Sequence, residues 1–149
     1  MPNLDVTIVG AGPAGIDMAL TLAKLVGIRY GVLKGDRVGE SLRSWPAQTR
    51  FITPSFHSNT FGYAVNEASS PAMFTGGEHP SGKEYANYLS FIAEAHDLPV
   101  IGNCKVQKVE QFSKDGFILS TDQDELHSRF LNWVTGEYQF LVLAPFPGA

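Results

Sequence analysis

The sequence predicts an α/β fold, because two kinds of hydrophobic pattern follow one another along its 149 residues. In the first quarter, a strand pattern, a helix pattern with a period near 3.6 and a second strand pattern form a βαβ unit. In the last third the period changes to two, which is typical of strands. A glycine-rich turn, Gly10-Ala11-Gly12-Pro13-Ala14-Gly15, joins the first strand to the first helix.

The βαβ unit is expected over residues 4–33. Residues 4–9 (LDVTIV) form a short β-branched run that ends in glycines, as a buried strand does. Residues 13–26 have apolar side chains at helical spacing, and Gly27 is placed to end that helix. Residues 28–33 (IRYGVL) are the second strand, so the crossover between the two strands should be right-handed.

Residues 34–81 show no clear period and are rich in Gly, Pro, Ser, Thr and Asn. Their aromatic residues argue for packing against the rest of the chain, and these are Trp45, Phe51, Phe56, Phe61, Tyr63 and Phe74. A connection of this length is either a functional loop or a disordered one. Ser81-Gly82-Lys83-Glu84 then matches a capping box, which predicts a helix that runs to about Asp97.

Three strands are predicted in the last third, over residues 100–109, 116–121 and 126–134. Polar turns separate them. They form either a three-stranded antiparallel meander or two strands of one that lead into a final central strand. Residues 137–149 follow as a linker-like tail of a single domain, which we expect to span residues 1–149.

The glycine-rich turn has the G-x-G-x-x-G pattern between a strand and a helix, which is the context in which this motif binds a dinucleotide. Gly10 permits the tight turn, Gly12 lets the backbone approach a pyrophosphate, and Gly15 lets helix and strand pack closely. The helix N-terminus offers N–H groups to the anion, and Pro13 stands where its missing donor is not needed. A plain glycine turn is the alternative interpretation.

The second part of a dinucleotide fingerprint is an acidic residue about 20 positions further on, which accepts hydrogen bonds from the ribose hydroxyls. Lys34 occupies that position, and a lysine has no acceptor. Asp36 takes this role if the strand continues. Two further interpretations stay open: Lys34 binds a 2′-phosphate, which favours NADP, or it is a solvated lysine at the end of a strand.

The composition excludes several classes of partner and site. The net charge is −4 and the sequence has no basic stripe, so we expect no nucleic-acid partner. Cys104 is the only cysteine and the four histidines lack ligand spacing, so we expect no disulfide and no metal. Because no signal peptide and no apolar run of about 20 residues is found, we expect a cytoplasmic protein without a membrane partner.

Five segments make the chain resemble a known family: residues 6–15, residues 39–43 through 50–54, residues 79–81 with the helix after them, residues 133–136, and residues 145–148. They are similar to the FAD-dependent pyridine-nucleotide oxidoreductases, and the bacterial flavin-containing-monooxygenase-like branch is the closest likeness. The resemblance covers nearly the whole chain. It implies a Rossmann-like FAD-binding domain with an antiparallel β-meander, truncated relative to the family.

The resemblance also implies which residues hold the cofactor. The FAD pyrophosphate would be held by Gly10, Gly12, Pro13, Ala14 and Gly15. The flavin side would be lined by Ser41, Arg43 and the region of Thr53. The backbone near Val106 would meet the adenine. Thr135 and Gly136 would approach the cofactor from the closing strand. In the family, NAD(P)H passes hydride to the flavin, so no catalytic side-chain triad is expected.

The sequence departs from the family at particular positions. The family usually has Glu at Lys34, an apolar residue at Asn132 and Ala at Val134, and it continues into a nicotinamide-binding domain and a second FAD segment. We therefore expect the chain alone to lack turnover, and its uncovered surface to favour self-association. The first hypothesis is the FAD-binding portion of a monooxygenase-like oxidoreductase. The alternatives are a non-catalytic dinucleotide-binding module and a small NADP-binding domain.

Overall fold

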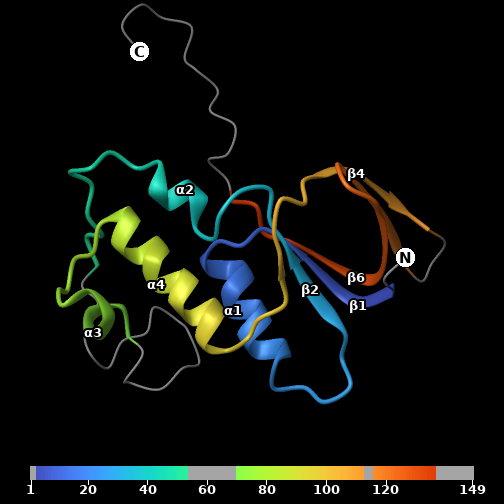
Figure 1. Ribbon diagram of the computed structural model, residues 1–149, viewed down its shortest axis with the longest axis horizontal. Helices are drawn as coiled ribbons and strands as arrows, with labels where there is room; N and C mark the ends of the chain where they lie inside the picture. The colour runs from blue at the N-terminus through green and yellow to red at the C-terminus, as the bar shows by residue number, and fades with distance from the viewer. Residues whose placement is uncertain (1–2, 54–69, 113–115, 137–149) are drawn as a thin grey trace, which may run out of the picture.

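One six-stranded sheet organises the computed structural model, which describes residues 3–53, 70–112 and 116–136. In chain order the elements are β1 (Asn3–Val9), α1 (Pro13–Leu22), β2 (Tyr30–Leu33), α2 (Glu40–Arg43), α3 (Pro71–Thr75), α4 (Gly82–Ala95), β3 (Val100–Ile101), β4 (Val106–Gln111), β5 (Phe117–Thr121) and β6 (Glu125–Trp133). Figure 1 shows α1 and α4 together on one side of the sheet, with β4 beyond its other side. The predicted tail, residues 137–149, lies outside the described residues.

The strand order is β3-β2-β1-β6-β5-β4. The first four of these strands pair in parallel, and β6, β5 and β4 pair antiparallel. β6 belongs to both parts, because it pairs with β1 through Val9 and Trp133 and with β5 through Leu119 and Leu126. The Rossmann-like βαβ unit with an antiparallel meander is thus confirmed, in the arrangement where two strands lead into a final central strand.

The sheet separates two apolar clusters. Ile8 and Val32 point toward α1 and α4, whereas Val9 and Leu33 belong to the cluster on the meander side. This alternation follows from the two-residue period of a strand. The parallel strands are therefore covered by helices on one face and by the meander on the other. Of the helices within the described ranges, none has the length and apolar content needed to cross a membrane.

The prediction of one strand over residues 100–109 is wrong. β3 stops at Ile101, and β4 begins only at Val106. Between them Asn103 has φ 51°, a left-handed conformation that does not continue a strand. The Cys104 N–H then donates to the Lys34 carbonyl at 2.9 Å, which turns the chain back over the end of β2.

The first helix ends at Leu22 and not at residue 26 as predicted. The Lys24 N–H donates to the Thr21 carbonyl and the Leu25 N–H donates to the Leu22 carbonyl, each three residues back. This tighter winding is a common end of an α-helix. Apolar residues beyond Leu22 still fit helical spacing in the sequence, which is why a longer helix was predicted. In the structure, however, Val26 is fully exposed.

Two short helices, α2 and α3, lie in the segment that the sequence left irregular. They are too short to produce a hydrophobic period. Gly39 begins α2 with φ 69°, and its N–H donates to the Ala11 carbonyl at 3.0 Å. A Cβ on Gly82 would overlap the Leu42 carbonyl, so α2 and α4 pack backbone against backbone. Phe56, Phe61 and Tyr63 of this segment lie outside the described residues.

The predicted capping box begins α4. The Ser81 hydroxyl accepts from the Glu84 N–H at 3.2 Å, and the Glu84 carboxylate accepts from the Ser81 N–H at 2.7 Å. These hydrogen bonds, from the backbone first and the hydroxyl second, hold the pKa of Glu84 below its ordinary value. The ionised carboxylate is therefore the form that stabilises the start of the helix.

We expect Glu84→Ala to lower the free energy of unfolding by about 1 kcal/mol at neutral pH, as loss of a helix cap does. Because folding lowers the pKa of Glu84, its contribution is present above the unfolded value of about 4.3 and is lost as the pH falls through the folded-state pKa. Urea unfolding at neutral and acidic pH checks this. Glu94→Ala, near the other end of α4, is the control. A Glu84→Ala effect that stays constant into acid would contradict the prediction.

Candidate functional site

The glycine-rich turn lies where the carboxyl ends of β1, β2 and β6 meet the start of α1. Three backbone hydrogen bonds hold the turn in place. The Gly10 N–H donates to the Leu33 carbonyl at 3.0 Å, and the Gly39 N–H donates to the Ala11 carbonyl at 3.0 Å. Just before the turn, the Val9 carbonyl accepts from the Val134 N–H at 2.9 Å. The ends of β2 and β6 and the beginning of α2 therefore all hold the turn. This edge is where open α/β sheets bind ligands.

Two glycines of the motif are required by the packing of the protein itself. Gly10 has φ 116°, and a Cβ there would overlap the Val134 carbonyl. A Cβ on Gly15 would overlap the Gly10 carbonyl. The first turn of α1 thus lies directly against the end of β1, a contact that no larger residue permits.

Gly12 has no such structural reason to be glycine. Its φ of −84° and ψ of −170° are available to any residue, and a Cβ there would meet no atom of the described residues within 4 Å. The space above it is open at the N-terminus of α1. That end of the helix has no side-chain cap and no acidic residue in its first turn, so it suits an anion. The residues present therefore fit the pyrophosphate of a dinucleotide.

The other predicted residues of this motif lie beside that space. Pro13 and Ala14 are exposed in the first turn of α1. The Thr135 nitrogen lies 3.1 Å from the position of a Cβ on Gly10, and Gly136 follows with φ 87°. The segment after β6 thus lies against the turn. That Thr135 and Gly136 approach a cofactor stays a prediction. Val134, where the family usually has Ala, is partly buried and packs against the apolar cluster on the α1 and α4 side of the sheet.

Lys34 is bonded to the end of β3 and to its own loop after β2. Its N–H donates to the Ile101 carbonyl at 3.1 Å, and its ammonium donates to the Asp36 carbonyl at 2.6 Å. It lines a cavity of about 440 Å³ between the loop after β2 and α4, together with Arg37 and Arg43. The side chain of Asp36 is exposed. The end of β2 therefore presents a cation where the fingerprint has an acceptor.

The guanidinium of Arg43 is engaged with α4. It donates to the Asn87 side-chain oxygen at 2.7 Å, to the Ser90 hydroxyl at 3.2 Å and to the Val38 carbonyl at 3.3 Å. These hydrogen bonds fasten α2 to α4. Ser41 is exposed on α2, and Thr53 is exposed at the edge of the described residues. That Ser41, Arg43 and Thr53 line a flavin stays a prediction.

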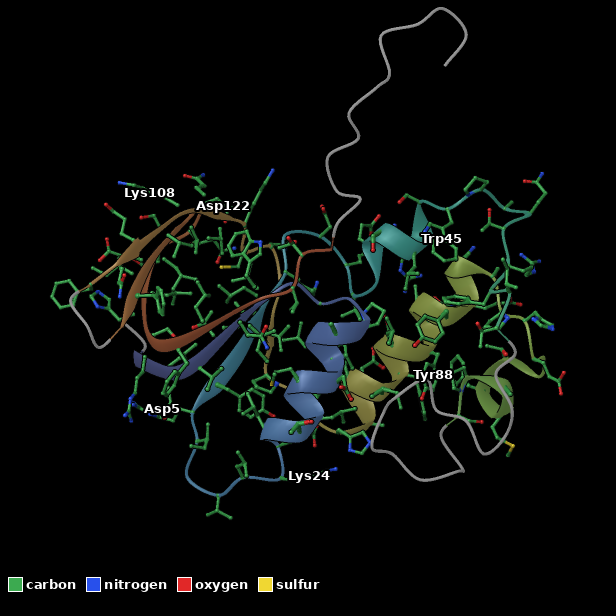
Figure 2. The ribbon with its side chains drawn as sticks, turned by 180° about the vertical axis from the view of Figure 1, so that it is seen from behind. Asp5, Lys24, Trp45, Tyr88, Lys108 and Asp122 are labelled. Atoms are coloured by element: carbon green, nitrogen blue, oxygen red, sulfur yellow. The ribbon has the colours of Figure 1, made fainter. Side chains whose placement is uncertain are left out.

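The two tryptophans lie in different surroundings. The Trp45 ring packs 5.1 Å from the Phe51 ring, which in turn lies 4.8 Å from the Tyr85 ring. Figure 2 shows Trp45 beside α2, far from Lys108 on the meander. Trp45 thus belongs to the packing of its loop. Trp133, the first residue of the closing motif, ends β6 and is 54% exposed, which the sequence pattern did not predict.

Val106 is the predicted adenine contact on the other side of the turn. It begins β4 and packs against the meander-side cluster that contains Val9 and Leu33. Since Val9 and Leu33 end β1 and β2, this cluster places Val106 near the same edge of the sheet as the turn. The predicted positions for the pyrophosphate and the adenine are therefore neighbours.

The comparisons with known proteins agree with this geometry. The family model described as pyridine nucleotide-disulphide oxidoreductase matches residues 7–149. A flavin monooxygenase from Stenotrophomonas maltophilia, in a mutant form, superposes with a TM-score of 0.81 at 20% identity over 99% of this chain and 42% of its own. The bacillithiol disulfide reductase from Staphylococcus aureus does so with a TM-score of 0.72 at 24% identity over 93% of this chain and 40% of its own.

A third structure, thioredoxin reductase from Streptococcus pyogenes, has a TM-score of 0.62 at 22% identity, over 95% of this chain and 38% of its own. The chain thus spans between 38% and 42% of the length of these three structures. At such identities the structures show a shared fold. The family model matches nearly all of the chain. The chain therefore belongs to the pyridine nucleotide-disulphide oxidoreductase family.

Proposed function

We propose that this chain is the FAD-binding portion of an NAD(P)H-dependent flavoprotein oxidoreductase. The observation that supports it best is Gly12, which neither its backbone conformation nor its neighbours require to be glycine. A ligand that approaches the backbone closely gives the reason. When bound, the flavin accepts hydride from reduced nicotinamide, so the protein supplies position and electrostatics.

The residues of the site then have separate tasks. The first N–H groups of α1, after Gly12, bind the pyrophosphate, and Thr135 and Gly136 limit the space from the side of β6. Ser41 and Thr53 lie toward the flavin, as the family resemblance implies, and Arg43 holds α2 in place beside them through its bonds to α4.

Within this function we propose the monooxygenase-like branch. The family resemblance of the motifs supports it, and a flavin monooxygenase is among the structural neighbours. A disulfide reductase is the second candidate, because two neighbours, from Staphylococcus aureus and Bacillus cereus, are named bacillithiol disulfide reductases. Cys104 is the only cysteine of the sequence and is buried, so this part of the protein has no dithiol pair.

We expect Gly12→Val to abolish FAD binding while leaving the melting temperature nearly unchanged. The added side chain fills the space that the pyrophosphate needs, and its Cβ would meet no atom of the described residues within 4 Å. Gly15→Ala is the matched comparison, and it should lower stability because its Cβ overlaps the Gly10 carbonyl. Calorimetric titration with FAD and a thermal melt measure both. If Gly12→Val binds FAD as the parent does, the phosphate assignment is wrong.

The second prediction uses Lys34 to separate FAD from NADP. If the ligand is FAD, Lys34→Glu supplies the missing ribose acceptor and should tighten FAD binding by about fivefold to a hundredfold, since an unpaired buried polar group costs about 1–3 kcal/mol. If the ligand is NADP, the same change removes a cation from the 2′-phosphate and weakens NADPH binding.

Lys83→Glu, with the same change of charge at the exposed start of α4, is the control for long-range effects in these titrations. Should Asp36 already bind the ribose, Asp36→Ala would weaken FAD binding and Lys34→Glu would change little. Four titrations without any effect would show that β2 does not end at the ribose.

A further inference from the structure

The guanidinium of Arg43 bonds to two separate parts of the chain. Its Nε donates to the Val38 carbonyl at 3.3 Å, and its terminal nitrogens donate to the Asn87 side-chain oxygen at 2.7 Å and to the Ser90 hydroxyl at 3.2 Å. The Ser90 hydroxyl in turn donates to the Ala86 carbonyl at 3.1 Å. One half-buried cation therefore joins the backbone before α2 to the middle of α4, and Figure 1 shows these two helices side by side.

Two peptide groups connect this guanidinium to the glycine-rich turn. The Val38 carbonyl belongs to the same peptide group as the Gly39 N–H, and that N–H donates to the Ala11 carbonyl at 3.0 Å. The Ala11 carbonyl in turn shares a peptide group with the Gly12 N–H. A trans peptide group is planar and its N–H points away from its carbonyl, so a hydrogen bond at one end fixes the direction of the other. The path from Arg43 thus ends at the Gly12 N–H.

The packing of α2 on α4 leaves this path little freedom. A Cβ on Gly39 would lie 2.8 Å from the Ala86 Cβ, so the backbone that begins α2 rests directly on α4. Ala11 is buried, with 7% of its surface exposed. A buried backbone carbonyl needs a donor, and the Gly39 N–H supplies it. The position of α2 on α4 therefore determines where the Ala11 carbonyl can lie.

We infer that Arg43 is a positioning residue for the glycine-rich turn, held in place by Asn87 and Ser90 of α4. It acts through the peptide group that ends in the Gly39 N–H and touches no part of the cofactor. The inference rests on the proposed function, and it gives Arg43 a task different from the flavin contact that the family resemblance implies. Because each hydrogen bond in a chain polarises the next, the cation also makes the Gly12 N–H a stronger donor to an anion.

ADP and FAD share the pyrophosphate, but only FAD has a flavin, so calorimetric titration with both separates positioning from a flavin contact. Asn87→Ala removes the acceptor that holds the Arg43 guanidinium. We expect it to weaken the binding of ADP and of FAD by a similar factor, about threefold to tenfold, because binding must then order the turn. Arg43→Lys keeps the charge but lacks the planar fork, so it should behave as Asn87→Ala does. Asn87→Asp keeps an acceptor for the guanidinium and should bind both ligands within about twofold of the parent.

A general loss of stability has to be distinguished from this positioning role. Asp5→Ala removes the acceptor of the Arg29 N–H near the start of β1, at the far end of that strand from the turn. We expect it to lower the melting temperature and to leave ADP affinity unchanged. In the Asn87→Ala protein, amide hydrogen exchange should become faster at Gly39 and stay slow at Gly10, whose N–H bonds to the end of β2. Equal acceleration at both amides would show a loosened fold and contradict the positioning role.

The outcomes separate this inference from the proposed function. If the parent binds FAD and Asn87→Ala binds ADP and FAD as the parent does, the positioning role is wrong and the proposed function stands. If Arg43→Lys weakens FAD binding but not ADP binding, Arg43 contacts the flavin and the inference is overturned. If the parent binds ADP but not FAD, weaker ADP binding by Asn87→Ala supports the positioning role while the flavin assignment fails. If neither ADP nor FAD binds to the parent, both are overturned.

Discussion

The candidate site depends on one contact, in which the Gly15 backbone lies directly against the Gly10 carbonyl. Because neither residue has a side chain, the first turn of α1 reaches the ends of β1 and β6. The hydrogen bond from Gly10 to Leu33 adds the end of β2. A side chain at either glycine would push the helix away and move its first N–H groups out of this edge. Backbone contacts thus determine where the first N–H groups of α1 lie.

Features with a local cause were predictable from the sequence. The strands β1 and β2, the capping box of Ser81 and Glu84, and the glycine-rich turn each depend on a few neighbouring residues. The break between β3 and β4 follows from the left-handed conformation of Asn103 and from the bond of Cys104 to Lys34 at the end of the neighbouring strand β2. A period of two continues through that break, so the pattern alone cannot show it. The short helices α2 and α3 leave no period at all.

The same distinction applies to the site. Arg43 has the charge expected near a cofactor, but its partners Asn87 and Ser90 are 44 and 47 residues away, so only the fold reveals how its guanidinium is used. The three glycines of the motif look equivalent in the sequence. The structure separates Gly12, where open space adjoins the helix N-terminus, from the two that packing requires. It is this difference that turns a motif into an argument for a ligand.

Exposure of an aromatic residue is weak evidence of a binding site by itself. Two exposed residues of β6 show which further observations strengthen that evidence. Phe130 is 55% exposed and Trp133 is 54% exposed on the same strand. The Phe130 ring has the Arg129 guanidinium 5.1 Å from its centroid, a cation–π contact. Trp133 instead adjoins an apolar cavity and the edge that holds Gly12. The two residues are equally exposed, but Trp133 also lines this cavity and pairs with the strand end that precedes the glycine-rich turn.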